Sequence, residues 1–82
     1  MIIGYFADGP WSHRALEKLL ANSAIKIAFI CARYDRQDPV LKQKASQSEI
    51  PFLVHPDINT TDFMLQIEPY ACDLFVSMSF NQ

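Results

Sequence analysis

The sequence predicts an α/β fold: half of a doubly wound, mostly parallel Rossmann-like sheet with helices on both faces. Short apolar runs rich in strand-forming residues alternate with segments of helical spacing. The runs are apolar on both faces, as is typical of strands that helices cover on either side. Right-handed crossovers carry the second and third strands outward from the first and return the fourth to its other side. We therefore expect the strand order 3-2-1-4.

The first strand and helix follow from the opening residues. "MIIGYFA" at 1–7 is a short apolar run that stops at the turn signal "DGP". From Pro10 the apolar residues share one helical face, namely Ala15, Leu16, Leu19 and Leu20. Either Asp8 or Gly9 can cap this helix, and Pro10 suits its first turn because the missing amide is not needed there.

Three further strands are predicted, and the last of them raises a question of completeness. They are "IKIAFICA" at 25–32, "IPFLVHP" at 50–56 and "DLFVSMSF" at 73–80. Prolines at both ends of the third strand favour an edge position. The fourth strand lies beside the first at the topological switch point, which leaves it a bare apolar edge. We expect residues 1–82 to be the amino-terminal part of a larger, incomplete domain, or a unit that dimerises through this edge.

The remaining two helices have weaker patterns. One begins at Pro39 after Asp38 and runs to about Ser48, with Val40, Leu41 and Ala45 as a thin apolar face. The other runs from Thr61 to Ile67 after a cap at Asn59 or Thr60, and its "FMLQI" stripe predicts core packing. The polar residues Asp35, Arg36 and Asp38 are expected to form a solvated loop.

Length and charge exclude several classes of protein. A chain of 82 residues makes one domain at most. The net charge of -2 and the scattered Lys and Arg residues give no basic patch for nucleic acid. Because no signal peptide or membrane span is recognisable, we expect a cytoplasmic protein without a membrane partner. Cys31 and Cys72 stand in apolar segments without C-x-x-C spacing, which predicts buried reduced thiols.

The candidate ligand site lies at the carboxyl ends of the first and fourth strands. Ligands of open α/β sheets bind there, so "ADGPWSH" and "SFNQ" form opposite lips of one crevice. Asp8, Gly9, Trp11 and His13 are the candidate substrate-binding residues: helix-start amides can meet an anion, an indole can stack, and an imidazole can transfer a proton. Alternatively, Asp8 only caps, Gly9 only turns the chain, and Trp11 only covers the sheet edge.

Several kinds of site are absent from the sequence. The single glycine after the first strand does not make the G-x-G-x-x-G of a dinucleotide site. His55 has no partner at metal-ligand spacing from His13, which argues against zinc, and G-x-S-x-G is missing. We therefore assign no catalytic and no metal-binding residue.

Three segments resemble a known family. "RALEKLL" at 14–20, "EIPF" at 49–52 and "CDLFVSMSF" at 72–80 are similar to the first helix, third strand and fourth strand of the 10-formyltetrahydrofolate-dependent formyltransferases, such as methionyl-tRNA formyltransferase and the sugar-nucleotide N-formyltransferases. The resemblance implies formyl transfer from the folate, as co-substrate, to an amine in one-carbon metabolism. It also implies that Phe80, Asn81 and Gln82 approach the folate.

The same resemblance implies that residues 1–82 alone are inactive. The family's Asn-x-His and later Asp, which polarise the formyl carbonyl and handle protons, do not occur in them. "DGPWSH" departs from the "GTPEF" type of the tRNA enzymes, and no basic patch is present. An amino sugar linked to a nucleotide, as in amino-sugar biosynthesis, is therefore favoured over tRNA as the acceptor.

Two other functions are compatible with the fold. One is a non-catalytic α/β module that dimerises, or binds a protein or nucleotide, through the open edge. The other is a receiver-like signalling domain, but only Asp8 follows the first strand, where an acidic pair would be expected.

Overall fold

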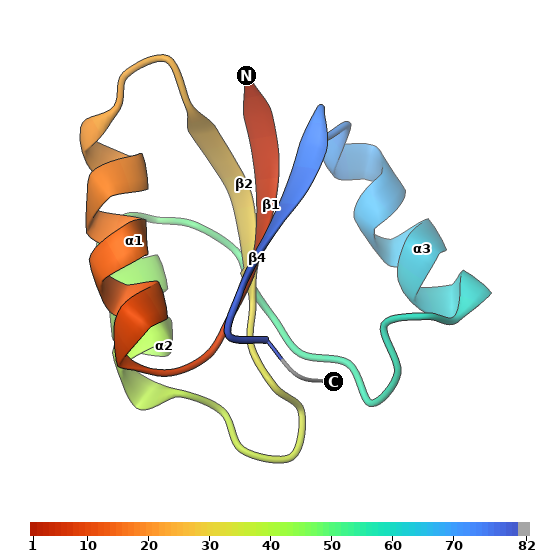
Figure 1. Ribbon diagram of the computed structural model, residues 1–82. Helices are drawn as coiled ribbons and strands as arrows, with labels where there is room; N and C mark the ends of the chain where they lie inside the picture. The colour runs from red at the N-terminus through yellow and green to blue at the C-terminus, as the bar shows by residue number, and fades with distance from the viewer. Residues whose placement is uncertain (81–82) are drawn as a thin grey trace.

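A four-stranded sheet stands between helices on both of its faces (Figure 1). The computed structural model describes residues 1–80. Its elements, in chain order, are β1 (Ile2–Ala7), α1 (Pro10–Ala21), β2 (Lys26–Cys31), α2 (Pro39–Gln47), β3 (Phe52–Leu53), α3 (Thr61–Ile67), the 3-10 turn η1 (Glu68–Tyr70) and β4 (Leu74–Met78). Helices α1 and α2 cover one face and α3 covers the other (Figure 1).

The sheet has the predicted order and direction. Its strands are all parallel and run β3-β2-β1-β4, which confirms the Rossmann-like half-fold. The third strand lies at an edge as predicted, but only Phe52 and Leu53 pair with β2 instead of 50–56. Pro51 and Pro56 cannot donate to a ladder, so pairing fails on both sides of this short strand.

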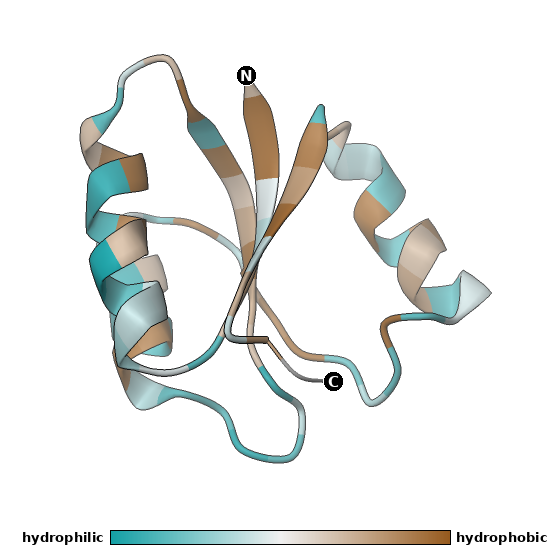
Figure 2. Cartoon of the chain, in the orientation of Figure 1, coloured by the Kyte–Doolittle hydropathy of each residue, from teal (hydrophilic) through white to brown (hydrophobic). Residues whose placement is uncertain are grey.

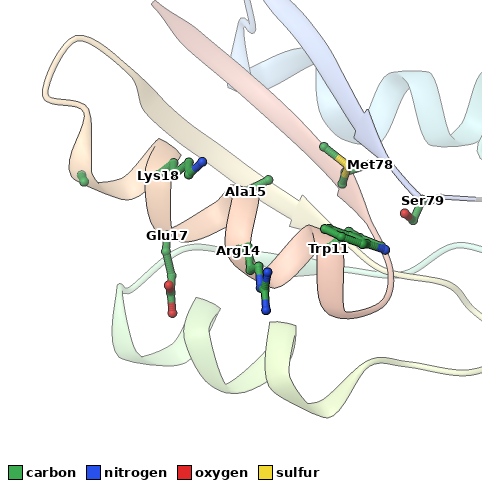
Figure 3. Close-up of a pocket in the computed structure, with 8 residues that line it drawn as sticks. Trp11, Arg14, Ala15, Glu17, Lys18, Met78 and Ser79 are labelled. Atoms are coloured by element: carbon green, nitrogen blue, oxygen red, sulfur yellow. The ribbon is translucent and has the colours of Figure 1, made fainter.

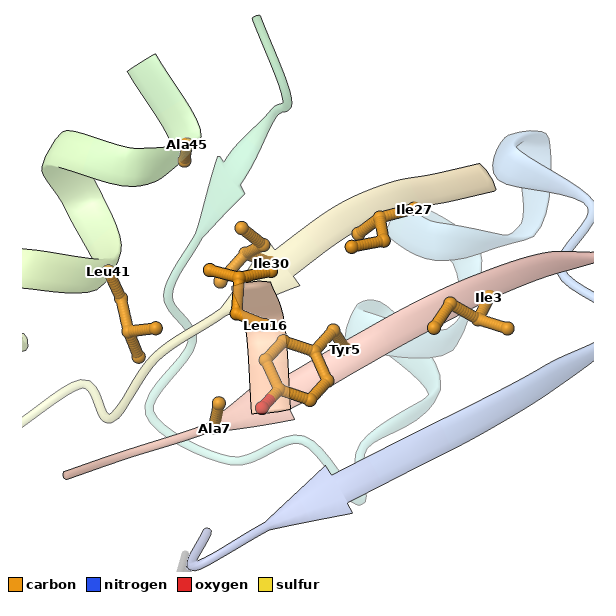
Figure 4. Packing of buried hydrophobic residues seen from close by; sticks show 8 residues of the cluster. All are labelled: Ile3, Tyr5, Ala7, Leu16, Ile27, Ile30, Leu41 and Ala45. Carbon is orange, nitrogen blue, oxygen red and sulfur yellow. The ribbon is translucent and has the colours of Figure 1, made fainter. Parts of the chain in front are cut away.

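The core beneath α1 and α2 joins the helices to the two central strands (Figure 4). Its buried members are Ile3, Tyr5, Ala7, Leu16, Ile27, Ile30, Leu41 and Ala45. The Tyr5 hydroxyl donates to the carbonyl oxygen of Ser12 at 2.8 Å, so the one polar atom of this phenol is satisfied. Burial raises the pKa of Tyr5 to about 12, and the phenol therefore stays neutral.

The core beneath α3 is aromatic. The Phe6 ring meets the Phe29, Phe63 and Phe75 rings edge to face, with centroids 5.6 to 6.1 Å apart. Gly4 makes this packing possible, because a Cβ there would lie 2.7 Å from Cε2 of Phe29 and 2.9 Å from Cδ1 of Phe75. Only a residue without a side chain fits between these two rings.

The predicted apolar faces of all three helices need correction. In α1, Leu20 is 42% exposed and does not belong to the buried face. Val40 is 38% exposed, so the buried face of α2 is formed by Leu41 and Ala45. In α3 only Phe63 and Ile67 are buried, whereas Met64 and Leu65 face outward and are more than half exposed. Residues four apart share a helical face, so a seven-residue helix against one sheet face buries one such pair.

Strand β4 leaves one side of the sheet uncovered, as predicted. It pairs with β1 alone and ends the strand order. Leu74 and Phe75 are 41% and 50% exposed, and the strand is apolar over much of its length (Figure 2). Unpaired backbone groups beside exposed apolar side chains make this edge the least protected part of the fold. Among residues 1–80, no helix has the length and apolar character needed to cross a bilayer.

Candidate functional site

The carboxyl ends of β1 and β4 lie side by side. Ala7 is in register with Met78, and the Asp8 amide donates to the Met78 carbonyl oxygen at 3.2 Å. The loop after β1 and the residues after β4 therefore meet at one edge of the sheet. This is the arrangement predicted for the two lips of a ligand crevice.

Gly9, not Asp8, is the residue that precedes α1. It is the N-cap with φ 82° and ψ 175°, and no side chain caps the helix, so the capping role considered for Asp8 is wrong. Asp8 instead faces the Arg36 guanidinium at 3.9 Å, which is the outer limit of an ion pair. The Gly9 carbonyl oxygen accepts a hydrogen bond from Oγ of Ser12 at 2.6 Å, which fixes the first turn of α1.

His13 points away from the crevice and toward α2. Its Nε2 lies 2.7 Å from Oδ2 of Asp38, an atom that also accepts the Gly9 amide at 3.1 Å. The other oxygen, Oδ1, accepts the Val40 and Leu41 amides and so caps α2. One carboxylate thus holds the β1–α1 loop, α1 and α2 together.

Asp38 is buried, so its assignment to a solvated loop is wrong. Its side chain is 9% exposed. Burial raises the pKa of this carboxyl, but the hydrogen bonds from His13 and from three backbone amides outweigh burial and hold the pKa below its ordinary value. Asp38 is therefore an ionised structural link at neutral pH.

Trp11 and two following turns of α1 line an open groove beside β4 (Figure 3). The groove has a volume of about 840 Å³, and its walls are Trp11, Arg14, Ala15, Glu17, Lys18, Ala21, Met78 and Ser79. Trp11 is 69% exposed, and the Arg14 guanidinium carbon lies 5.7 Å from the centroid of its ring. The indole therefore does not close the sheet edge but stands at the mouth of a groove.

The groove is positively charged. Within residues 1–80, neither Arg14 nor Lys18 forms an ion pair. The one carboxylate that lines the groove belongs to Glu17, whose Oε1 accepts a hydrogen bond from Nζ of Lys44 at 3.1 Å. Two cations without acidic partners thus lie on the α1 side of this groove.

The residues after β4 turn sharply. Ser79 has φ 55°, a left-handed conformation that is uncommon for residues other than glycine. The Phe80 ring packs against Phe6 with centroids 5.6 Å apart and lines a second groove, of about 260 Å³, on the α3 face. Its folate contact stays a prediction, and Asn81 and Gln82 lie outside the described residues.

The second groove is apolar. Phe63, Met64 and Ile67 of α3 line one side, and Phe75 and Ser77 of β4 line the other. Both grooves thus border β4, one on each face of the sheet, and both open beside the uncovered edge.

The second histidine, His55, contacts α3. Nε2 of His55 lies 3.2 Å from Oδ2 of Asp62, and the imidazole stacks at a tilt on Phe63. No cluster of three potential metal-ligating side chains is found among residues 1–80.

The two thiols differ in burial. Cys31 is buried, and burial raises the pKa of its thiol to about 12. Cys72 is half-buried, and burial together with Asp73 raises the pKa of its thiol. Neither thiol is therefore activated as a nucleophile.

Sequence reasoning missed Arg14, Lys18 and the role of Asp38. The spacing of Trp11, Arg14 and Lys18 could have shown that they share one helical face. Nothing local could have paired Asp38 with His13, because 25 residues separate them.

No known protein family model matches the chain, and no curated protein sequence matches it.

Proposed function

We propose that residues 1–82 form the amino-terminal part of a folate-dependent N-formyltransferase. The reaction transfers the formyl group of 10-formyltetrahydrofolate to an amine, on an amino sugar linked to a nucleotide. The amine nitrogen attacks the formyl carbon, the bond from that carbon to the folate nitrogen breaks, and tetrahydrofolate leaves with the proton that the amine loses.

The observation that carries the proposal is the meeting of the β1 and β4 carboxyl ends. The hydrogen bond between Asp8 and Met78 brings the loop that departs from the tRNA enzymes next to the carboxyl end of β4, two residues before Phe80, which the resemblance assigns to folate. The segments that carry the resemblance occupy the elements it implies: 14–20 lies in α1, 49–52 leads into β3, and 72–80 contains β4. Donor and acceptor would thus approach one crevice from two neighbouring strands.

The described residues supply binding surfaces and no reacting group. His13 is engaged with Asp38, and the Asn-x-His of the family does not occur in residues 1–82. Polarisation of the formyl carbonyl and proton handling would therefore come from residues that follow Gln82. The role of this part is then to position the folate and the acceptor.

The test is an assay of the full-length product of the gene that encodes these residues. We expect tetrahydrofolate release from 10-formyltetrahydrofolate only when an amino-sugar nucleotide is added, and no release with a chain that ends at Gln82. Release by the 82-residue chain itself would refute the assignment of the chemistry to later residues. Absence of release by the full-length product with any amino-sugar nucleotide or tRNA would refute the function.

A second candidate function is a non-catalytic module that dimerises through β4. The exposed Leu74 and Phe75 on an unpaired strand favour it. Light scattering of the 82-residue chain over a range of concentrations separates the two functions. A tight dimer at every concentration supports the module, whereas a monomer, or association that increases with concentration, does not.

A further inference from the structure

The groove between α1 and β4 combines a stacking surface with two cations. Trp11, Arg14 and Lys18 occur at spacings of three and four residues, so successive turns present them on one side of α1. From Trp11 to Lys18 the helix rises roughly 10 Å. An aromatic ring at one end and positive charge along the next two turns match a planar base that carries phosphates.

The position of the groove supports a ligand site. One end of it, formed by Trp11, Met78 and Ser79, lies at the carboxyl end of β4, where parallel sheets of this order bind their ligands. Met78, the last residue of β4, and Ser79 after it face Trp11 (Figure 3), so a flat ring can lie against the indole beside the thioether. Among the described residues, the Ser79 hydroxyl is the one polar side-chain group on this wall.

The charges that line the groove favour an anionic ligand. Arg14 and Lys18 lack acidic partners among residues 1–80, while the carboxylate of Glu17 is bound by Lys44 at 3.1 Å. An anionic occupant is favoured over a like-charged one.

We propose that this groove binds the nucleoside diphosphate portion of the acceptor. The base stacks on Trp11, and the diphosphate accepts hydrogen bonds from Arg14 and is held by the charge of Lys18. The identity of the biological ligand, the acceptor of the formyl group, rests on the proposed function. This assignment replaces the helix-start amides as the anion-binding groups, because the Gly9 amide donates to Asp38.

The test uses uridine diphosphate and the 82-residue chain. Trp11 is the only tryptophan, so its fluorescence reports on the groove without labelling. We expect uridine diphosphate to quench Trp11, and calorimetry to show affinity weakened about tenfold in Arg14→Gln, as expected when one charge-assisted hydrogen bond is lost. Lys18→Gln is expected to weaken binding severalfold.

The control variant is Lys42→Gln. It removes the same charge from an exposed position on α2 that is outside the groove, and we expect the affinity to change less than twofold. Circular dichroism of each variant shows whether the fold is kept. All three positions are exposed, so we expect each variant to fold.

Three results would overturn the proposal. The first is no binding of uridine diphosphate at millimolar concentration. The second is equal loss of affinity in Lys42→Gln and Arg14→Gln, which would indicate general attraction by positive charge. The third is binding of inorganic pyrophosphate as tightly as uridine diphosphate, because the base would then contribute nothing.

The assay of formyl transfer is independent of this titration. Transfer to an amino-sugar nucleotide without binding of uridine diphosphate in the groove would reject the site and keep the function. Binding in the groove without any formyl transfer would keep the site and reject the function.

Discussion

Asp38 shows how one side chain fixes three backbone segments. Its carboxylate accepts hydrogen bonds from the Gly9 amide of the loop, from His13 of α1 and from the first turn of α2. The position of Trp11, two residues after Gly9, therefore depends on a residue that touches no part of the groove.

Replacing Asp38 tests this dependence. Asp38→Ala removes the helix cap and leaves the Gly9 amide and His13 without their partner, and we expect a loss of about 2 to 4 kcal/mol in the free energy of unfolding. Urea denaturation measures it. The matched control is Asp35→Ala, whose exposed pairing with Arg33 should contribute little to the free energy of unfolding. Equal losses in the two variants would contradict the linking role.

The same carboxyl predicts a dependence of stability on pH. The pKa of Asp38 in the folded chain lies below the ordinary value of 3.8. Its contribution is therefore fully present above that value and is lost as the pH falls through it toward the folded pKa. Urea midpoints measured between pH 7 and pH 3 should decrease at the acid end, and by less in Asp38→Asn. An identical decrease in the variant would show that other carboxyls cause it.

Gly4 is a second single residue on which the packing of the core depends. A methyl group there would overlap the Phe29 ring and approach Phe75. We expect Gly4→Ala to lower the free energy of unfolding by about 1 to 3 kcal/mol through overpacking, measured by urea denaturation. The double variant Gly4→Ala with Phe75→Leu relieves part of the overlap, because one of the two rings is removed. If Gly4→Ala is as stable as the wild type, the rings have room that the structure does not show.

At the scale of elements, strand β4 differs from its neighbour β1. β1 has a hydrogen-bonding strand on each side, whereas β4 has one only. The Asp73 amide donates to the Ile2 carbonyl oxygen at 2.7 Å. Within β4, the Met78 carbonyl oxygen accepts the Asp8 amide and therefore faces β1. The two-residue period of a strand directs the Leu74 and Val76 amides toward β1 as well.

Hydrogen exchange tests this description of the edge. The Phe75 and Ser77 amides face outward, so we expect them to exchange with solvent much faster than the Leu74 and Val76 amides of the same strand. Exchange measured residue by residue in the 82-residue chain gives the comparison. Equal protection of all four amides would mean that another strand covers the edge, as in the dimerising module.

The elements were largely predictable, and the reason is local. Apolar runs bounded by Asp, Gly and Pro specify where each strand and helix begins, and the residues of β1, α1, α2 and α3 fall within one or two positions of the prediction. The length of β3 was only partly predictable. The flanking prolines indicated an edge strand, but the residues that pair with β2 depend on where the two strands diverge. Exposure of Met64 and Leu65 depends on the absence of a neighbour on that side of α3, which no local pattern reports.

At the scale of the whole molecule, the strand order places the site, and side-chain direction decides its chemistry. The two lips were predictable from the crossover rule alone. The orientation of His13 was not, because it depends on a carboxylate 25 residues away. The proposed ligand-binding residues accordingly include Arg14 and Lys18 on the turns of α1, in place of residues in the loop before the helix.

The most direct test of the proposed function follows the formyl carbon itself. The full-length gene product is incubated with 10-formyltetrahydrofolate that carries an isotopic label in the formyl carbon, together with amino-sugar nucleotides. We predict that the label appears as a formamide on the sugar nitrogen, at a rate that depends on both substrates. Label that remains on the folate, or reaches water as formate whether or not an amine is present, would contradict the assignment.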